Sequence, residues 1–416
     1  MNDIDLYIEE LCRRAKEASR ALSKATAAQK NRVILRAAAL LRERAPVLVC
    51  ENRKDMDAAT ENGVKEVMLD RLRLDESRIC GIADALDELC ALADPIGEGT
   101  QWTRPNGLKI RRVRVPLGVI GVIYEARPNV TVDVAALCIK TGNAVVLRGG
   151  KEALHSNLAL AAVLREALAS EGLPADAVVA VARPEREGAQ ALMKMRGLID
   201  LLIPRGGKGL IRAVVDGATV PVIETGAGNC HVYIDESADI DMALRVTDNA
   251  KLSRPAVCNA AETLLVHRAV APVFLPAFAE LTKGRLTVRG CEATKAILPS
   301  VERATEEDYE TEYDDTILAV RVVDSLDEAI SHINRYTTAH SEAILTNDLA
   351  NATRFKTEVD AACVYVNAST RFSDGGEFGF GAEVGISTQK LHARGPMGPD
   401  ALTTVKYEIE GNGQIR

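Results

Sequence analysis

Apolar residues recur three and four positions apart through the first 94 residues, as in NRVILRAAALLRERAPVLV at positions 31–49. This spacing places the apolar side chains on one face of a helix, so the sequence predicts a helical lead-in. The next stretch, GLKIRRVRV at 107–115, is extended and strongly basic, and Pro116 ends it. Such a segment is typical of an exposed or edge strand. We expect this strand to pair with another subunit.

From Leu117 onward, short apolar runs alternate with helical patterns. The first set of runs occupies residues 117–123, 143–148, 177–182, 198–204 and 220–224. The second set occupies residues 231–235, 262–267, 316–324, 342–346 and 363–367. Strands that are apolar on both faces and separated by helices form parallel sheets, because a right-handed crossover helix brings the next strand back alongside the last. We predict a Rossmann-like nucleotide-binding domain, a second α/β domain, and a loop over the glycine-rich residues 371–387.

Composition and charge narrow the class of protein. A chain of 416 residues, 47% hydrophobic and 26% charged, is expected to form two main domains. A net charge of -8 with scattered cations argues against nucleic-acid binding, and the acidic start and short apolar runs argue against a signal peptide and a membrane span. Nine cysteines without a CxxC pair and six histidines without an HExxH pattern indicate neither a disulfide framework nor a metal site. We expect a cytoplasmic protein.

Two glycine pairs lie at the carboxyl ends of predicted strands, where open α/β sheets bind ligands. One pair lies within Arg148–Lys151 and the other within Arg205–Lys208, each between two cations. Backbone N–H groups and cations are what phosphates require, although glycines at such turns can serve backbone geometry alone. The usual G-x-G-x-x-G fingerprint is absent after residue 123. A third turn, ETGAG at 224–228, has almost no side chains over its backbone. It indicates either that another group approaches this backbone closely or that the segment is a simple interdomain turn.

Cys258, in SRPAVCNAAETLLV at 253–266, is the best candidate for a nucleophile. Lys251 and Arg254 lie upstream, and nearby cations stabilise a thiolate. The alternative is a buried, inert thiol, which is a common fate of cysteine. The rival is Cys230 beside His231, but neighbouring residues on a strand point to opposite faces, so these two are not expected to form a dyad.

Several long motifs around these residues are similar to those of a known enzyme family. They are NAKLSRPAVCNAAETLLVH, GVIYEARPNVT, NAVVLRGGKEA, LLIPRGGKGLI, VPVIETGAGNCHVYID and FGFGAEVGISTQKLHARGPMGPDALTTVKY. Over nearly its whole length the chain resembles the gamma-glutamyl phosphate reductases, also called glutamate-5-semialdehyde dehydrogenases, of the aldehyde dehydrogenase superfamily. The resemblance implies a Rossmann-like cofactor domain without the usual glycine fingerprint, a catalytic domain with a cysteine, and an oligomerisation segment.

The resemblance also implies a reaction. Cys258 would attack the acyl carbon of L-glutamyl 5-phosphate, expel phosphate and form a thioester, which NADPH would reduce to L-glutamate 5-semialdehyde for proline biosynthesis. We expect the amide N–H of Cys258 and the side chain of Asn259 to stabilise the oxyanion. A homo-oligomer (a dimer or a tetramer) and channelling with glutamate 5-kinase follow from the same resemblance.

The superfamily pattern implies further site residues. Glu224 stands where oxidative members activate a hydrolytic water, and Glu312 matches a glutamate that holds the nicotinamide ribose. Arg148 replaces a lysine beside the cofactor ribose, and Lys151 falls where a cation favours the 2′-phosphate of NADP. The predicted catalytic residues are Cys258, Asn259 and Glu224. The predicted cofactor-binding residues are Arg148, Gly149, Gly150, Lys151, Gly206, Gly207 and Glu312, and the predicted substrate-binding residues are Arg127, Asn129 and Arg254.

The sequence assigns three parts to the chain. Residues 1–224, completed by 372–396, form the helical lead-in and the NADP-binding domain, and residues 225–371 form the catalytic domain. Residues 104–116 and 397–416 form the oligomerisation segment. Two other functions remain open. The first is an aldehyde-oxidising dehydrogenase, which would need Glu224 as a base. The second is a cysteine hydrolase or noncatalytic binding protein, in which neither glycine pair would have a function.

Overall fold

The amino-terminal part of the computed structural model, which describes residues 2–64 and 66–416, is helical. Its helices are α1 (Asp3–Leu22), α2 (Ala27–Glu43), α3 (Ala45–Glu61), α4 (Glu66–Leu72) and α5 (Glu76–Ala91). The Asn2 side chain accepts a hydrogen bond from the Asp5 N–H (2.9 Å), and the Asp5 carboxylate accepts one from the Asn2 N–H (3.1 Å). This exchange satisfies amide groups that the first turn of a helix leaves without partners. The predicted helical lead-in is confirmed.

The chain divides into two compact units. The first contains residues 1–224, 379–385 and 397–416, and the second contains residues 225–378 and 386–396. The sequence-based assignment placed all of 372–396 with the cofactor domain, and for 372–378 and 386–396 this is wrong, because both segments belong to the second unit. The Gly226 N–H donates to the carbonyl of Ile386 (3.2 Å), and Thr225 forms an antiparallel bridge with Ser387. These backbone contacts hold the returning chain against the first residues of the second unit.

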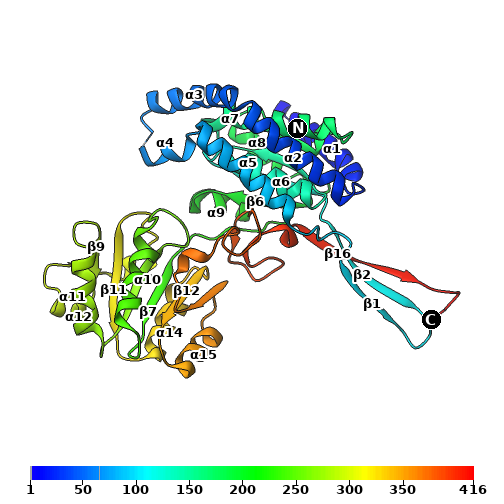
Figure 1. Cartoon of the computed structure of the whole chain (residues 1–416). Helices are drawn as coiled ribbons and strands as arrows, with labels where there is room; N and C mark the ends of the chain where they lie inside the picture. The colour runs from blue at the N-terminus through cyan, green and yellow to red at the C-terminus, as the bar shows by residue number, and fades with distance from the viewer. Residues whose placement is uncertain (1, 65) are drawn as a thin grey trace. The chain divides into compact units, whose positions relative to one another are not determined.

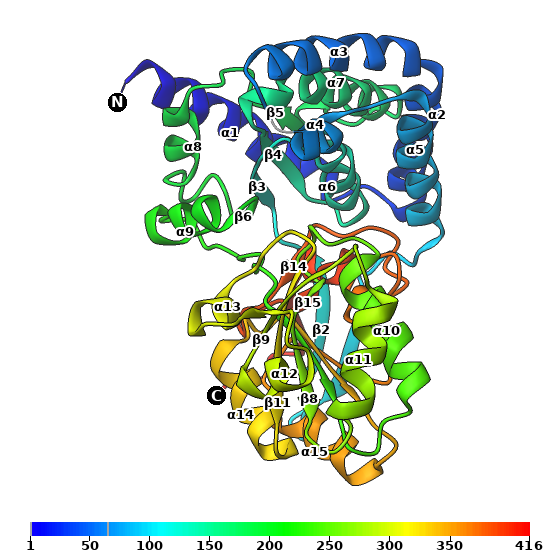
Figure 2. The same cartoon turned by 90° about the vertical axis from the view of Figure 1, so that its left-hand side faces the viewer.

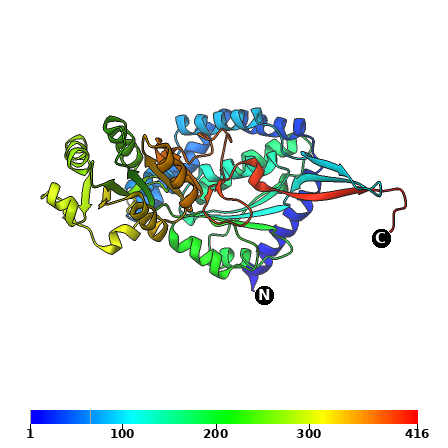
Figure 3. The ribbon, with the colours of Figure 1, turned by 90° about the horizontal axis from the view of Figure 1, so that it is seen from below.

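Four parallel strands form the sheet of the first unit, in the order β5-β4-β3-β6. They are β3 (Val119–Tyr124), β4 (Ala144–Arg148), β5 (Val178–Ala180) and β6 (Leu201–Arg205). Helices α1 and α8 (Arg186–Leu192) pack on one side, and α6 (Asn129–Lys140) and α7 (Leu154–Ser170) pack on the other (Figures 2 and 3). Every residue of β3 is buried, as expected for a strand covered on both faces. The predicted parallel sheet is confirmed.

The predicted strand at residues 220–224 is reduced to a single bridge between Val222 and Leu202. The Leu202 N–H donates to the carbonyl of Pro221 (2.8 Å), and the Ile223 N–H donates to the carbonyl of Leu202 (3.0 Å). Pro221 has no N–H to continue the ladder. The prediction of a full fifth strand is therefore wrong.

A three-stranded antiparallel sheet extends away from the helices of the first unit (Figures 1 and 3). Its order is β1-β2-β16, and its strands are β1 (Gly99–Thr103), β2 (Lys109–Pro116) and β16 (Thr403–Glu410). β16 pairs with β2 over its whole length, from Thr403 opposite Pro116 to Glu410 opposite Lys109. Both edges of the basic strand β2 are thus occupied by strands of the same chain. The prediction that this strand pairs with another subunit is wrong.

Seven parallel strands form the sheet of the second unit, in the order β10-β9-β11-β8-β7-β12-β13. They are β7 (Cys230–Ile234), β8 (Ala261–His267), β9 (Thr287–Gly290), β10 (Glu302–Arg303), β11 (Ile317–Val323), β12 (Ser341–Leu345) and β13 (Cys363–Val366). The short strands β9 and β10 are additions to the predicted set. The second α/β domain is otherwise confirmed.

Helices cover both faces of this second sheet (Figure 1). Val232 belongs to the core cluster that contains Phe274 of α11 (Ala271–Leu281), whereas the next residue, Tyr233, belongs to the cluster that contains Ile330 of α14 (Leu326–Tyr336). Successive strand residues point to opposite faces, so each strand contributes to both cores. The α11 face also carries α10 (Ile240–Leu252) and α12 (Glu292–Ile297), and the α14 face also carries α15 (Leu349–Glu358).

The remaining elements are short. They are η1 (Lys151–Ala153), η2 (Ala175–Ala177), α9 (Lys208–Gly217), α13 (Glu306–Glu310), η3 (Thr370–Phe372), β14 (Ile386–Ser387), β15 (Gly395–Pro396) and η4 (Pro399–Leu402). The glycine-rich residues 371–387 are mainly turns, as predicted. Among the described residues, no helix combines the length and apolar character needed to cross a bilayer, and no three His, Cys, Asp or Glu side chains are grouped to hold a metal ion.

Candidate functional site

Cys258 lies in the loop between α10 and β8, at the amino end of the second sheet. The residue is half-buried. The turn at Gly228 packs directly against it, since a Cβ added to Gly228 would lie 1.4 Å from the carbonyl oxygen of Cys258 and 2.5 Å from its Cα. Only glycine allows so close an approach. The bare backbone of the ETGAG turn therefore has a structural reason, which is contact with the loop of Cys258.

Glu312 fixes this glycine turn. Its carboxylate accepts a hydrogen bond from the Gly228 N–H (2.7 Å). Glu312 thus supports the backbone on which Cys258 packs, and its contact with a nicotinamide ribose stays a prediction. Glu224 is the last residue of the first unit before the chain crosses to the second, and its catalytic role also stays a prediction.

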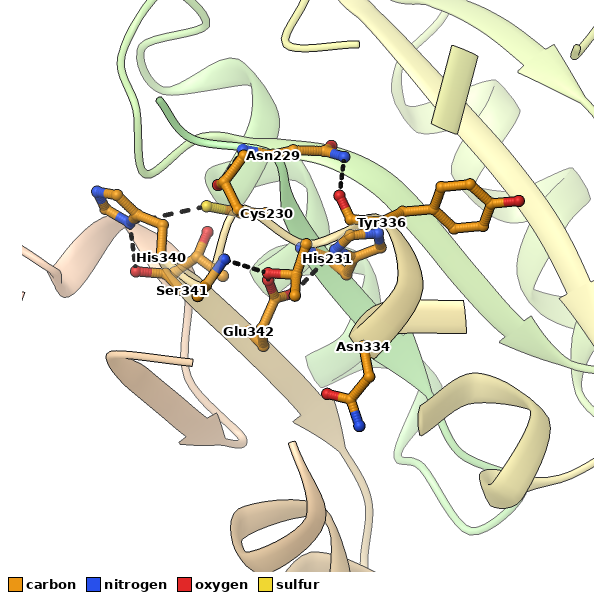
Figure 4. Close-up of polar contacts among 12 residues, drawn as sticks. Asn229, Cys230, His231, Asn334, Tyr336, His340, Ser341 and Glu342 are labelled. Carbon is orange, nitrogen blue, oxygen red and sulfur yellow. Dashed lines mark hydrogen bonds and ion pairs between the residues drawn. The ribbon is translucent and has the colours of Figure 1, made fainter. Parts of the chain in front are cut away.

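Cys230 begins β7, and its side chain points toward His340 (Figure 4). Its Sγ–H donates to the carbonyl of Cys258 (3.2 Å), and its Sγ is 3.9 Å from Nδ1 of His340. Burial keeps the pKa of Cys230 well above its usual range and lowers the pKa of His340 to about 4, so both groups are neutral near pH 7. His231 instead contacts Glu342, with Nδ1 3.0 Å from the carboxylate. The prediction that Cys230 and His231 form no dyad is confirmed.

Asn259 ties the loop of Cys258 to η3. Its Nδ2 donates to the carbonyls of Arg371 (3.2 Å) and Ser373 (2.9 Å). A side-chain amide has two hydrogens on its nitrogen, and both are used. The prediction that this side chain donates to the oxyanion is therefore wrong for this structure. Asn259 positions the loop, and the amide N–H of Cys258 stays a predicted donor.

Lys251 does not lie free beside the thiol. Its ammonium group pairs with the carboxylate of Glu262 (2.5 Å), and both side chains are fully buried. Burial raises the pKa of Glu262 to about 8, against the opposing effect of Lys251. Lys251 is on the last turn of α10 and Glu262 is near the start of β8, so the pair closes the base of the Cys258 loop. The structure thus directs Nζ of Lys251 to Glu262 in the buried base of the loop, and an effect of Lys251 on the thiol stays a prediction.

Two arginines lie on or beside the loop of Cys258. Arg254 is exposed on the same loop, and Arg371 is half-buried in η3, with its Nε–H donating to Oγ of Ser253 (3.2 Å). Burial, and then repulsion from Arg254, lowers the pKa of Arg371, whereas attraction to Cys258 acts in the opposite direction. Arg371 was not predicted from the sequence. It follows Asn259 by 112 residues, and its only local signal is a place at the start of a glycine-rich loop.

In the first unit, both glycine turns approach neighbouring side chains closely. A Cβ on Gly149 would lie 2.1 Å from Nδ2 of Asn157, and a Cβ on Gly206 would lie 2.6 Å from Cδ of Glu125. The Gly207 N–H, at the start of α9, donates to the carboxylate of Glu125 (3.1 Å). A helix N-terminus favours negative charge. The turn that was predicted to bind a phosphate therefore holds an anionic group of the protein itself.

Arg148 has a structural role. Its Nη1 donates to the carbonyl of Gly149 (2.9 Å), and its Nη2 donates to the carbonyls of Pro184 (2.9 Å) and Glu185 (3.1 Å). The guanidinium is thereby engaged with the backbone around β4 and α8, and its contact with the cofactor ribose stays a prediction. Lys151 is exposed at the start of η1, and its predicted role stays a prediction.

The predicted substrate residues are divided between the units. Asn129 begins α6 in the first unit, and its Nδ2 donates to the carboxylate of Asp133 one turn later (2.9 Å). Burial raises the pKa of Asp133 to about 6, although Asn129 and Arg205 oppose this shift. Arg127 is half-buried just before the same helix, whereas Arg254 belongs to the second unit. Arg254 lies in the loop of Cys258, and the substrate contacts of all three residues stay predictions.

Comparison with known proteins gives consistent matches. The model of the aldehyde dehydrogenase family matches residues 6–315 and 309–390. Gamma-glutamyl phosphate reductase from Moorella thermoacetica is 58% identical over 416 residues and covers 100% of both chains. The enzyme of the same name from Clostridium perfringens is 57% identical over 97% of this chain and 98% of its own.

Solved structures extend the comparison. The crystal structure of gamma-glutamyl phosphate reductase from Thermotoga maritima is 50% identical, has a TM-score of 0.96, and covers 98% of this chain and 99% of its own. An acetylating aldehyde dehydrogenase from Geobacillus thermoglucosidasius is 19% identical with a TM-score of 0.73 over 100% of both chains, and shares the fold. The predicted fold class is confirmed, and the family consists of oxidoreductases. The chain belongs to the aldehyde dehydrogenase family and, within it, to the gamma-glutamyl phosphate reductases.

Proposed function

We propose that the chain reduces L-glutamyl 5-phosphate to L-glutamate 5-semialdehyde and phosphate with NADPH, as a step of proline biosynthesis in the cytoplasm. The observation that carries this proposal is the loop of half-buried Cys258, whose main chain packs on the Gly228 turn and whose charge interacts with Arg371, in a chain 58% identical to a gamma-glutamyl phosphate reductase.

Cys258 is the nucleophile of the first step. Its thiolate sulfur forms a bond to the acyl carbon of the substrate, and the bond from that carbon to the phosphate oxygen breaks with its electron pair. A thioester remains on the protein, and inorganic phosphate leaves. Negative charge grows on the acyl oxygen during this step, and a preorganised donor there is worth roughly 3 kcal/mol. The amide N–H of Cys258 is the donor we assign.

The glycine turns of the first unit suit a dinucleotide. Gly206 and Gly207 leave the main chain bare at the start of α9, and the Gly207 N–H already binds a carboxylate, so this turn accepts anionic oxygen. Lys151 supplies a cation for a 2′-phosphate, and we assign Glu312 to the nicotinamide ribose. When bound, NADPH supplies the hydride that reduces the thioester carbon. Breaking the carbon–sulfur bond then releases the semialdehyde and restores the Cys258 thiolate.

Glu224 has no necessary part in this forward reaction. A base that activates water would hydrolyse the thioester and waste it, whereas an aldehyde-oxidising dehydrogenase needs such a base. Replacement of Glu224 by Gln therefore separates the two functions, since an oxidising enzyme would lose its turnover and the proposed reductase would keep most of it.

One assay tests the proposed function directly. Purified protein is mixed with L-glutamate 5-semialdehyde, phosphate and NADP, and the absorbance of the reduced cofactor is followed. We expect reduction of NADP that requires phosphate. Equal rates with and without phosphate would indicate an aldehyde-oxidising enzyme, and no reduction at all would leave a hydrolase or a binding protein.

We also propose that the β1-β2-β16 sheet joins subunits into a homo-oligomer. The registers of this sheet place Trp102 opposite Ile110, and Ile110 opposite Ile409, so all three side chains share one face. Trp102 is 41% exposed and Ile409 is 61% exposed. Apolar residues gathered in this way on a projecting sheet are typical of an interface. Light scattering that finds only monomers would contradict this, and channelling with glutamate 5-kinase stays a prediction.

A further inference from the structure

The short helix η3 is fastened to both ends of the Cys258 loop. After the thiol, Oγ1 of Thr370 donates to the carbonyl of Asn259 (2.7 Å), and Nδ2 of Asn259 donates to the carbonyls of Arg371 in η3 and of Ser373 just after it. Before the thiol, Nε of Arg371 donates to Oγ of Ser253 (3.2 Å). These bonds make the loop and η3 one rigid assembly, with the Arg371 side chain lying along it.

The far side of η3 is anchored in the sheet. Oγ of Ser373 lies 2.5 Å from Oγ of Ser341 and 2.7 Å from Oη of Tyr365, and the Ser373 side chain is fully buried. Ser341 and Tyr365 belong to the neighbouring strands β12 and β13. Because the Ser373 hydroxyl contacts side chains of both strands, the second sheet fixes the backbone next to Arg371. The position of Arg371 therefore does not depend on a mobile loop.

This arrangement keeps two like charges together. Arg254 is the second strongest influence on the pKa of Arg371, after burial, and both act to lower it, while Cys258 opposes them. Holding two guanidinium groups in mutual repulsion costs free energy, which an anion bound between them recovers. Arginine is suited to this task because its Nη groups bind two oxygens of a phosphate at once.

We propose that Arg371, together with Arg254, forms the subsite that binds the phosphoryl group of the acyl phosphate, and inorganic phosphate in the reverse direction. This inference rests on the proposed function. The phosphate oxygen is bonded to the carbon that Cys258 attacks, so the phosphoryl group must lie beside the thiol in any productive orientation. The α-carboxylate of the same substrate lies at the other end of a five-carbon chain.

The subsite contributes to one defined event. When the bond between the acyl carbon and the phosphate oxygen breaks, the electron pair goes to the leaving oxygen and increases its negative charge. The guanidinium groups of Arg371 and Arg254 stabilise that charge. In reverse, they place inorganic phosphate for attack on the thioester carbon, which expels the Cys258 thiolate.

The test compares Arg371→Met, Arg371→Lys and Arg254→Met with the wild type in the semialdehyde assay. The matched control is Arg354→Met, which removes an arginine paired with Asp327 and Glu358 at the surface of α15. We expect Arg371→Met to raise the KM for phosphate about tenfold or more while the KM for the semialdehyde stays within about twofold. Arg371→Lys and Arg254→Met should show smaller increases of the phosphate KM, and the control should show none.

A second measurement does not need turnover. Inorganic phosphate should slow the alkylation of Cys258 by iodoacetamide in the wild type and in Arg354→Met, but not in Arg371→Met with an unchanged melting temperature. A rise of the semialdehyde KM alone would assign Arg371 to the α-carboxylate and overturn the proposal, as would equal protection by phosphate in all variants. If the wild type shows no turnover while phosphate protection still depends on Arg371, the proposed function fails and the subsite stands.

Discussion

The two parallel sheets carry their candidate sites at opposite ends of their strands. In the first unit the glycine turns follow β4 and β6, at the carboxyl ends where open α/β sheets usually bind ligands. In the second unit Cys258, the proposed nucleophile, precedes β8, and the Gly228 turn precedes β7. The first site is built from the main chain of single turns, whereas the second is built from side chains of several loops.

Strand order explains how the second site is assembled. The strands β8, β7, β12 and β13 are consecutive neighbours in the sheet. The segments that enter these strands therefore meet at one edge, and they bring Cys258, Cys230, Ser341 and, through Ser373, the residue Arg371 together. A site of this kind depends on the packing of the whole sheet, and a glycine turn depends mainly on its own backbone.

The substitution with the largest expected effect removes the function of the second site and leaves the first site intact. Cys258→Ser should lower turnover by about a thousandfold or more, because the hydroxyl is a far weaker nucleophile than a thiolate. The variant should still bind NADPH in a fluorescence titration, since the glycine turns lie in the first unit. Cys230→Ser is the control and should keep most activity. Near-normal turnover of Cys258→Ser would remove this cysteine from the mechanism.

The difference between the two sites also explains which of their features could be predicted from the sequence. The parallel sheets, the glycine turns and Cys258 are marked by local patterns, which are short apolar runs, paired glycines and a cysteine ahead of a strand. Arg371 and Ser373 carry no such pattern, because their role arises from the order of strands in the sheet. The contact of Lys251 with Glu262 could not be predicted for a similar reason, since sequence spacing does not show that these two side chains meet.

A pair of glycine substitutions tests how differently the two sites use their backbone. Gly228→Ala places a Cβ against the main chain of Cys258, and such overpacking should cost ~3 kcal/mol of stability or more and lower turnover at least tenfold. Gly207→Ala meets nothing within 4 Å, so its melting temperature should stay unchanged. We expect only its affinity for NADPH to fall, about tenfold, if the dinucleotide approaches this turn.

Thermal melting and NADPH titration of both variants give the answer. A stable and fully active Gly228→Ala would show that the loop of Cys258 tolerates displacement, which contradicts the rigid assembly described above. An unchanged NADPH affinity in Gly207→Ala would move the phosphate contact away from the start of α9.

The buried pair beneath the Cys258 loop predicts a pH dependence of the stability of the second unit. Burial raises the pKa of Glu262 from its ordinary value of 4.5 to about 8. Between these values the folded protein holds a proton that the unfolded chain has lost, so this group's stabilisation is complete below pH 4.5 and is lost as the pH rises through 8. The free energy of unfolding should fall with a slope of up to ~1.4 kcal/mol per pH unit from Glu262.

Glu262→Gln tests this slope because glutamine cannot titrate. Urea unfolding at pH 5, 6.5 and 8 should show that the variant loses the decline seen in the wild type, and that Glu280→Gln, at an exposed position of α11, keeps it. A variant with an unchanged slope would mean that Glu262 stays ionised beside Lys251 throughout this range.

The smallest expected effect concerns the carboxylate that occupies the first site. Glu125 accepts the Gly207 N–H (3.1 Å), and a bound phosphate would have to displace it or share this end of α9 with its negative charge. Glu125→Gln keeps an oxygen acceptor but removes the charge, so the affinity for NADPH should rise about two- to threefold. Glu43→Gln, at an exposed carboxylate of α2 paired with Arg36, is the matched control. An affinity that falls in Glu125→Gln would show that Glu125 organises the turn for the dinucleotide, and the first site would then also depend on a side chain from a neighbouring strand.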